Sequence, residues 1–212
     1  MSNALRRATP DSAILVYVDY VTGLDNLMNT IPVKQYKNNI AAFARLNGLF
    51  KMPTVVLGEE NEYYGTFLPE MADVTHDVRR YNRTTISGFV PEFRQWLEST
   101  GRRDVIIGGI SIDNCVLHTV LDLRREGYNV WVVVDVSGTN SPLAEQAAIM
   151  RMRDAGAVIT GWLAMATELG VDFASPYGDG MKDLVATYWP ASTVGPVEDS
   201  TPDGHGMQPV PA

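Results

Sequence analysis

Short runs of apolar residues without polar alternation recur along the chain, and each has the length of one strand. Such runs are typical of strands buried on both faces of a sheet. The segments that we interpret as strands are 13–18, 53–58, 76–81, 105–107, 128–134 and 157–162. Between them, apolar residues repeat at helical spacing over 33–46, 91–100, 115–126, 141–156 and 163–169. Strands that alternate with helices predict an α/β protein with a parallel sheet covered on both faces.

One stretch combines a strand, a turn and a helix around the only cysteine of the chain. The run Val105–Ile107 ends in two glycines, and apolar residues from Val116 onward repeat at helical spacing. Cys115 therefore lies where a buried strand turns into a helix. We expect Asp113 to be the N-cap of that helix and Cys115 to lie in its first turn.

This position suits a nucleophile, because a cysteine reacts as its thiolate. The first turn of a helix has unpaired N–H groups and a partial positive charge, and both favour an anion. The same N–H groups could bind the oxyanion that forms when a thiolate attacks a carbonyl. The alternative is that Cys115 is a small buried hydrophobic residue without a chemical role.

Two predicted strands end in an aspartate. Asp19 follows the first strand, and Asp135 follows the fifth. In open parallel sheets, ligands bind outside the carboxyl ends of the strands. Asp19 is therefore a candidate functional carboxylate, with a turn-forming aspartate as the alternative.

Length and composition narrow the class of protein. A chain of 212 residues fits one domain, which we assign to residues 1–189, followed by a Pro/Gly-rich C-terminal tail over 190–212. The net charge of -8 argues against nucleic-acid binding, and no apolar run is long enough to span a bilayer. The residues up to Asp11 have no apolar segment typical of a secretory signal, and one cysteine fits a reducing compartment. We therefore expect a soluble, cytoplasmic protein.

Four segments resemble the isochorismatase-like cysteine hydrolases, in particular their YcaC-like branch. Gly109–Val116 is similar to the family's nucleophile segment, which has a glycine, a branched residue, two variable residues, an acidic residue, one more residue and then Cys-Val. Asp19–Leu24 resembles the loop after the family's catalytic aspartate, with Val21 where a glutamine is often found. The other two segments are Gly65–Glu70 and Asp135–Thr139, and the likeness extends over about 13–169.

The resemblance implies a Rossmann-like, three-layer α/β/α fold with a six-stranded parallel sheet. It implies a triad of aspartate, lysine and cysteine, in which Asp19 and Cys115 match two members. It also implies a cis peptide bond between Ile110 and Ser111 that helps to shape an oxyanion hole. Backbone N–H groups near Ser111, Asn114 and Cys115 would be its donors.

The lysine of the triad is replaced in this chain. The family lysine lies four residues before a Ser-Ala-Phe-like segment; here that segment is Ser87–Phe89, and Arg83 stands at the lysine position. An arginine keeps the positive charge but cannot transfer a proton at neutral pH. We expect Arg83 to hold the cysteine as a thiolate and to orient Asp19, with Arg80 or Arg79 as alternatives.

These residues predict a cysteine-dependent hydrolase of a small-molecule amide or related C–N bond. Asp19 would take the thiol proton and return it to the leaving group, while Cys115 forms a thioester acyl-enzyme that water then releases. The alternative is a catalytically silent oligomeric protein of the same fold, with Cys115 as a redox-sensitive thiol. We expect the loops Tyr20–Leu24 and Tyr63–Leu68 to form walls of the pocket. The expected substrate contacts are Tyr20, Leu24, Phe67, Ile112 and Thr139.

No cofactor and no metal are expected. The related nicotinamidases carry a metal site built from an aspartate and histidines, but this chain has three histidines and no Asp-x-His pair. His118, three residues after Cys115, is a weaker candidate to activate the thiol. A dinucleotide-binding domain is disfavoured, because no Gly-x-Gly-x-x-Gly follows the first strand. Relatives of this kind are oligomers, so the resemblance implies a homo-oligomer, from dimer to octamer.

Overall fold

The computed structural model describes residues 5–75 and 78–189. In this part of the chain, six parallel strands form one sheet in the order β3-β2-β1-β4-β5-β6. The strands are β1 Ala13–Val18, β2 Thr54–Leu57, β3 Arg79–Tyr81, β4 Asp104–Gly109, β5 Asn129–Val133 and β6 Val158–Thr160. The predicted six-stranded parallel sheet is confirmed, and its order is that of a doubly wound α/β fold.

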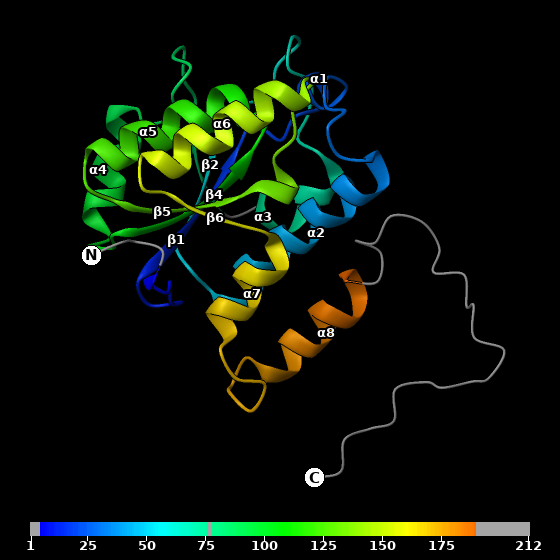
Figure 1. The fold of residues 1–212 in the computed structure, drawn as a ribbon, viewed down its shortest axis with the longest axis vertical. Coiled ribbons are helices and arrows are strands. Elements are labelled where there is room, and N and C mark those ends of the chain that lie inside the picture. Colours follow the sequence, from blue (N-terminus) through cyan, green and yellow to red (C-terminus); the bar gives the residue numbers. More distant parts are fainter. Residues whose placement is uncertain (1–4, 76–77, 190–212) are drawn as a thin grey trace, which may run out of the picture.

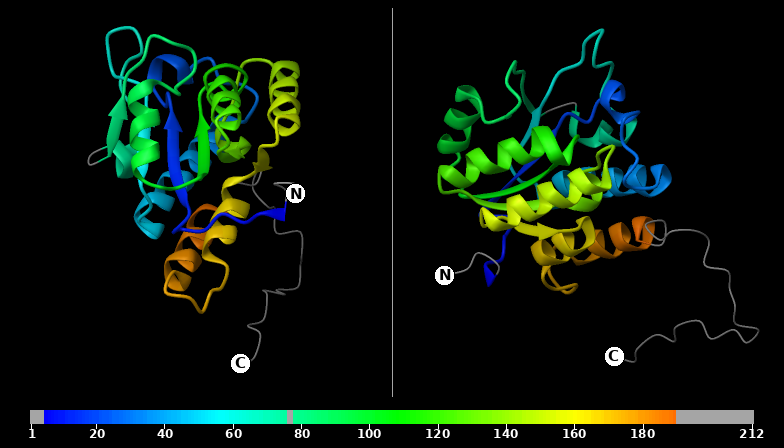
Figure 2. Two further views of the ribbon diagram at one scale, coloured as in Figure 1. Left: turned by 90° about the vertical axis from the view of Figure 1, so that its left-hand side faces the viewer. Right: turned by 45° about the horizontal axis from the view of Figure 1, so that its top comes forward.

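Helices cover both faces of the sheet and give the molecule three layers (Figure 1, Figure 2). They are α1 Thr22–Asp25, α2 Val33–Phe50, α3 Ala72–Thr75, α4 Pro91–Ser99, α5 Leu117–Arg125, α6 Pro142–Asp154, α7 Trp162–Gly170 and α8 Gly178–Tyr188. α4, α5 and α6 pack on one face, and α2, α7 and α8 pack on the other. Within the described residues, none of these helices has the length and apolar character that a membrane span requires.

The central strand β1 contributes side chains to both hydrophobic cores. Ile14 and Val16 belong to the core under α4, α5 and α6, whereas Leu15 and Tyr17 belong to the core under α2, α7 and α8. Every residue of β1 is buried. Burial on both faces is the physical reason why this strand is apolar at every position.

The ends of α2 and of the sixth strand are among the element boundaries that differ from the sequence prediction. α2 continues past Gly48, which has open space around its Cβ position, and ends at Lys51 in the left-handed conformation with φ of 51°. The sixth strand is shorter than predicted, because the Asp135 carboxylate accepts a hydrogen bond from the Trp162 N–H at 2.8 Å and Trp162 begins α7.

The sequence pattern did not predict α8. Gly178 and Gly180 in its first turn are poor helix formers, so the start of this helix lacks the helical spacing of apolar residues. Packing stabilises this helix: Met181 and Leu184 are buried in the core that α2 also covers. Gly180 allows a close approach to α2, since a Cβ at this position would lie 2.4 Å from the Leu49 side chain. The predicted tail over 190–212 lies outside the described residues.

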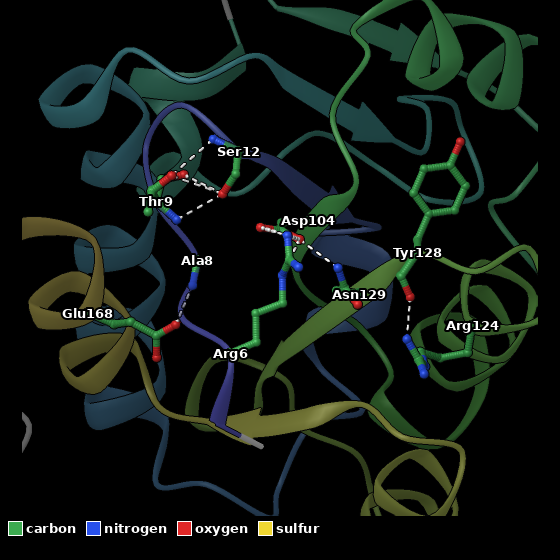
Figure 3. Close-up of polar contacts among 9 residues, drawn as sticks. All are labelled: Arg6, Ala8, Thr9, Ser12, Asp104, Arg124, Tyr128, Asn129 and Glu168. Carbon is green, nitrogen blue, oxygen red and sulfur yellow. Dashed lines mark hydrogen bonds and ion pairs between the residues drawn. The ribbon is translucent and has the colours of Figure 1, made fainter. Parts of the chain in front are cut away.

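At the amino ends of the strands, a polar network fastens the N-terminal segment (Figure 3). Asp104, fully buried at the start of β4, accepts hydrogen bonds from Arg6 at 3.0 Å and from Asn129 at 2.8 Å. The Ala8 N–H donates to the Glu168 carboxylate on α7 at 2.7 Å. The N-terminal segment thus covers the amino edge of the sheet and leaves a ligand site to the carboxyl edge.

Candidate active site

The candidate site lies at the carboxyl ends of β1 and β4, the two central strands of the sheet. The chain passes from β1 to β2 on one side, whereas β4 lies on the other side, so the strand order reverses here. Such a reversal leaves a crevice in which α/β proteins bind ligands. Asp19 follows β1, Arg83 follows β3, and Cys115 follows β4. Parallel pairing brings these three distant residues to one edge of the sheet.

Asp19 has an unusual backbone conformation. Its φ of 51° lies in the left-handed region, which a non-glycine residue seldom adopts. Its N–H donates to the Leu57 carbonyl at 2.9 Å and so continues the pairing of β1 with β2 by one residue. A sparsely populated conformation at the end of a central strand is a feature that clusters at functional sites.

Arg83 binds the Asp19 carboxylate through both ends of its guanidinium. Nη1 donates to Oδ1 at 2.9 Å, and Nη2 donates to Oδ2. The two side chains are only 7% and 11% exposed, so water screens the pair weakly. Burial lowers the pKa of Arg83, but the hydrogen bond and charge of Asp19 outweigh that effect and the pKa is raised overall. The planar fork fixes the carboxylate with two parallel bonds, which the single ammonium of a lysine cannot do.

The other two candidate arginines lie elsewhere on β3. Arg79 and Arg80 are exposed. Arg80 lies 3.8 Å from the Glu60 carboxylate, and its guanidinium stands 4.9 Å from the ring centre of Phe67. Arg83 is therefore the arginine that the structure brings to Asp19.

Cys115 is partly buried beside this ion pair. Burial and the negative charge of Asp19 raise the pKa of the Cys115 thiol to about 12, against the opposing charge and hydrogen bond of Arg83. Arg83 favours the thiolate, whereas burial and Asp19 act in the opposite direction. Asp19 and Cys115 line the same cavity, and the charge of Asp19 acts on the thiol, so a candidate proton acceptor lies near the sulfur.

The chain around Cys115 turns differently from the prediction. Ser111, and not Asp113, is the N-cap residue, because the chain begins to coil two residues earlier than predicted. Ile112–Val116 forms a π-helical turn ahead of α5, and the Val116 N–H donates to the Ser111 carbonyl at 3.2 Å. Cys115 thus lies in a wide turn of the kind that occurs frequently at functional sites.

The backbone near the thiol contains the predicted oxyanion-hole residues. The peptide bond between Ile110 and Ser111 is cis. The Asn114 N–H donates to the Ser111 carbonyl at 3.3 Å, so this amide is already engaged within the turn. Asn114 itself lines the cavity beside Cys115, whereas Ile110 is buried in the core.

The aspartate, arginine and cysteine line one cavity of about 280 Å³. Its walls come from the segments that follow β1, β2, β3 and β4. The lining residues are Asp19, Val21, Leu24, Gly58, Glu59, Tyr63, Tyr64, Arg83, Thr84, Thr85, Ile86, Asn114 and Cys115. A cavity of this size suits a small molecule.

Of the five predicted substrate contacts, Leu24 lines the cavity and the others do not. Tyr20 is 1% exposed, and its hydroxyl donates to a core carbonyl, that of Val136, at 2.9 Å. Its neighbour Val21 faces the cavity instead. Phe67 lies outside the cavity, under the guanidinium of Arg80.

Ile112 and Thr139 are both buried and do not line the cavity. Ile112 packs in the core under α5 and α6, and the Thr139 carbonyl accepts the N–H groups of Asn29 and Thr30. These residues are predicted from the family resemblance, which does not show which side of a loop faces the cavity.

Sequence reasoning missed several lining residues, above all Glu59 and the Thr84–Ile86 loop. Tyr63 and Tyr64 belong to a loop that was expected to form a wall. The available signal was position: Glu59 follows β2, which pairs with β1, and Thr84–Ile86 follows β3, which pairs with β2. Loops at that edge surround the site even when their composition is ordinary.

Asp135, the second aspartate at a strand end, has a structural contact instead of a place in the cavity. Its Oδ1 accepts the Trp162 N–H at 2.8 Å at the start of α7. Burial raises the pKa of Asp135 to about 6, although hydrogen bonds from the backbone oppose the shift.

A second, larger hollow of about 410 Å³ lies between α2 and α8. Its lining contains Arg45, Asp73 and Asp183 but no nucleophilic side chain. In residues 5–75 and 78–189, no three His, Cys, Asp or Glu side chains are arranged to hold a metal ion. The chemistry of the described chain is therefore concentrated around Cys115.

A family comparison identifies the class that this fold and site define. The model of the isochorismatase domain family matches residues 25–163, which include Arg83 and Cys115 and begin shortly after Asp19. The chain belongs to the isochorismatase family and is a hydrolase of that family.

The YcaC proteins are similar to this chain over most of its length. The protein named "Probable hydrolase YcaC" of Escherichia coli (strain K12) is 29% identical over 193 residues, which are 90% of this chain and 92% of that protein. The structure of YcaC from Pseudomonas aeruginosa with hexane-2,5-diol and covalent acrylamide has a TM-score of 0.83 at 29% identity, and the match covers 89% of this chain and 94% of that one. Escherichia coli YcaC, described as an octameric hydrolase of unknown specificity, has a TM-score of 0.82 at 30% identity, with coverage of 88% and 92%.

Proposed function

We propose that this protein is a cysteine hydrolase that cleaves a small-molecule amide or related C–N bond through a thioester acyl-enzyme. One observation carries the proposal: a thiol lies near a buried Asp19–Arg83 pair in the wall of a small cavity. A nucleophile, a base near it and a group that orients the base form the arrangement of nucleophilic catalysis.

The first half-reaction acylates Cys115. As Sγ attacks the carbonyl carbon, the thiol proton passes to the Asp19 carboxylate and an S–C bond forms. Asp19 then gives this proton to the leaving nitrogen, and the C–N bond breaks. Because burial and the charge of Asp19 raise the pKa of the thiol, we assign the proton transfer to the same step as the attack.

The second half-reaction restores the enzyme. Asp19 accepts a proton from water as the water oxygen attacks the thioester carbon. The C–S bond breaks, the acid leaves, and the proton returns to the sulfur. We assign the Cys115 N–H to the oxyanion that forms in each step, since the Asn114 N–H already has an acceptor.

Arg83 acts in this mechanism as a fixed positive charge. It cannot shuttle a proton at neutral pH. Its two hydrogen bonds orient the Asp19 carboxylate, and its charge opposes the rise of the Cys115 pKa. The substitution of arginine for the family lysine is thus compatible with a proton path through Asp19.

Two features of the YcaC relatives support the proposal. The Pseudomonas aeruginosa protein was solved with covalent acrylamide, an electrophile that adds to nucleophilic side chains through its alkene carbon. The Escherichia coli protein is octameric. We propose that this chain, too, forms a homo-oligomer.

The alternative is a catalytically silent protein that uses Cys115 as a redox-sensitive thiol. Redox-sensing cysteines have low pKa values and are accessible, because the thiolate is the form that is oxidised. The cavity and the buried Asp19–Arg83 pair beside Cys115 favour the hydrolase, because a redox-sensitive thiol requires neither.

The test is a screen of small primary amides for release of ammonia, with intact-mass detection of the acylated protein. We expect turnover by the wild-type protein and none by Cys115→Ala, which removes the nucleophile. Cys115→Ser provides a control of similar size. Equal ammonia release by wild type and Cys115→Ala, or none from any amide, would reject the hydrolase mechanism.

A further inference from the structure

Glu59 stands in the wall of the same cavity but has no part in the mechanism above. It lies two residues beyond the end of β2, the neighbour of the strand that carries Asp19. The Gly58 N–H donates to the Tyr81 carbonyl at 3.1 Å and fixes the backbone just before it. Glu59 is therefore held at the sheet edge where the reacting groups lie.

The Glu59 carboxylate is oriented by two neutral amides. Asn61 Nδ2 donates to Oε1 at 2.9 Å, and Asn82 Nδ2 donates to Oε2 at 2.7 Å. The two donors come from different loops, after β2 and after β3. An amide donor positions a carboxylate without neutralising it, and each carboxylate oxygen can accept a further hydrogen bond.

The charges that line the cavity do not balance. Three lining residues are charged, and two of them, Asp19 and Arg83, neutralise each other. Within residues 5–75 and 78–189, no cationic side chain lies within 4 Å of the Glu59 carboxylate. The nearby cation Arg80 lies against Glu60 and Phe67 and does not line the cavity. The cavity thus keeps one unpaired negative charge.

Aromatic rings stand in the same wall. Tyr63 and Tyr64 form an edge-to-face pair with ring centres 5.0 Å apart. The Gly23 N–H donates to the Tyr64 carbonyl at 2.8 Å and fastens this loop to α1. Glu59, Tyr63 and Tyr64 thus line one cavity, and a carboxylate together with aromatic rings favours the binding of an ammonium group.

From this arrangement we propose that the substrate is a small amide whose far end carries a positively charged amine, and that Glu59 binds this amine and determines specificity. This inference rests on the proposed function, since it names the substrate class of the same site. Glu59 forms no bond with the reacting atoms. It would raise the affinity for cationic substrates over neutral ones of the same shape.

Two acrylamides that differ in charge test the inference without requiring turnover. N-(2-aminoethyl)acrylamide and N-propylacrylamide have similar shapes, and the amine of the first is protonated at pH 8. The rate of Cys115 alkylation is followed by intact mass, with Cys115→Ala as the blank. The ratio of the two rates is divided by the ratio for free N-acetylcysteine, which removes differences in intrinsic reactivity.

We expect the wild-type protein to favour the cationic probe by about tenfold, as one charge-assisted hydrogen bond would provide. Glu59→Gln should abolish the preference, while Glu59→Asp should keep part of it. Glu62→Gln is the matched control, because Glu62 lies in the same loop, is exposed and does not line the cavity. A normalised ratio near one in the wild type, or an unchanged preference in Glu59→Gln, overturns the inference.

Hydrolysis of a second pair separates this inference from the proposed function. Glycinamide and propionamide have the same shape and differ in charge. If both are hydrolysed with equal kcat/KM and Glu59→Gln changes neither value, the hydrolase stands and the specificity proposal fails. If neither is hydrolysed but the alkylation preference depends on Glu59, the binding site for a cationic group stands and the hydrolase mechanism fails.

Discussion

Gly58 lies so close to Asp19 that a Cβ at position 58 would come within 2.7 Å of the Asp19 Oδ1 atom. The φ of Gly58 is 139°, a conformation that side chains other than glycine's rarely adopt. The conformational freedom of Gly58 therefore leaves room for the carboxylate that Arg83 holds beside Cys115.

Gly58→Ala should displace the Asp19 carboxylate and lower kcat/KM by about 10²-fold, the typical effect of a small misplacement of a catalytic group. Gly101→Ala is the matched control, because Gly101 also has a positive φ, 67°, but has open space around its Cβ position. We expect both variants to lose about 1–2 kcal/mol of stability through backbone strain. Equal kcat/KM in the two variants would contradict a role for Gly58 in positioning Asp19.

Asp19→Asn should separate thiol ionisation from catalysis. The charge of Asp19 raises the pKa of Cys115, so its removal should lower this pKa and move the alkylation profile to lower pH. Hydrolysis should nevertheless fall by about 10²–10⁴-fold, because the general base is lost. The measurements are the pH dependence of alkylation and kcat on the best amide. An unchanged alkylation profile would show that the carboxylate does not act on the thiol.

Arg83→Ala should have the opposite effect on the thiol. Arg83 lowers the pKa of Cys115 against the effects of burial and Asp19, so its loss should raise this pKa further and slow alkylation at pH 8. Removing one member of a buried pair should also cost about 3 kcal/mol of unfolding free energy, measured by urea denaturation.

Arg83→Lys, which restores the charge without the fork, should recover alkylation but leave kcat/KM about tenfold below wild type. Arginine would then be the adapted residue at this position. Higher activity in Arg83→Lys than in wild type would mean that the natural site is impaired.

Burial of Asp135 should make stability depend on pH. Its pKa is raised to about 6 in the folded state, so this contribution is complete below pH 4 and declines as the pH rises through 6. The loss should reach about 2 kcal/mol. Thermal unfolding of wild type and Asp135→Asn from pH 4 to 7 measures it, because the decline specific to Asp135 disappears in the variant. Parallel curves for the two proteins would refute the assignment.

Tyr20→Phe tests whether Tyr20 is a core residue and not a substrate contact. Its buried hydroxyl donates to the Val136 carbonyl at 2.9 Å. The variant should lose about 1–2 kcal/mol of stability, since that carbonyl loses its partner. Its KM for a hydrolysed amide should match that of wild type. A raised KM with unchanged stability would restore the predicted substrate contact.

The apolar runs of the sequence predicted the layers of the fold, because each run had to be a strand buried on both faces. The ends of the elements were less certain. Gly48 was predicted to end α2, but it lies within the helix, and the sixth strand stops early because Asp135 binds the start of α7. α8 was missed because its glycines hide a helix that packing against α2 stabilises. These details depend on contacts between segments that are distant in sequence.

The sequence by itself determined the parallel sheet, the position of Cys115 after a buried strand and the candidacy of Asp19 and Arg83, since these follow from local pattern and motif. Only the tertiary structure decided that Arg83 reaches Asp19, that burial and Asp19 raise the pKa of the thiol and that Glu59 lines the cavity. The physical reason is that charge, burial and hydrogen bonding depend on distance in space. A motif identifies which residues are present, whereas the fold determines which of them lie close together in the partly buried site at the edge of the sheet.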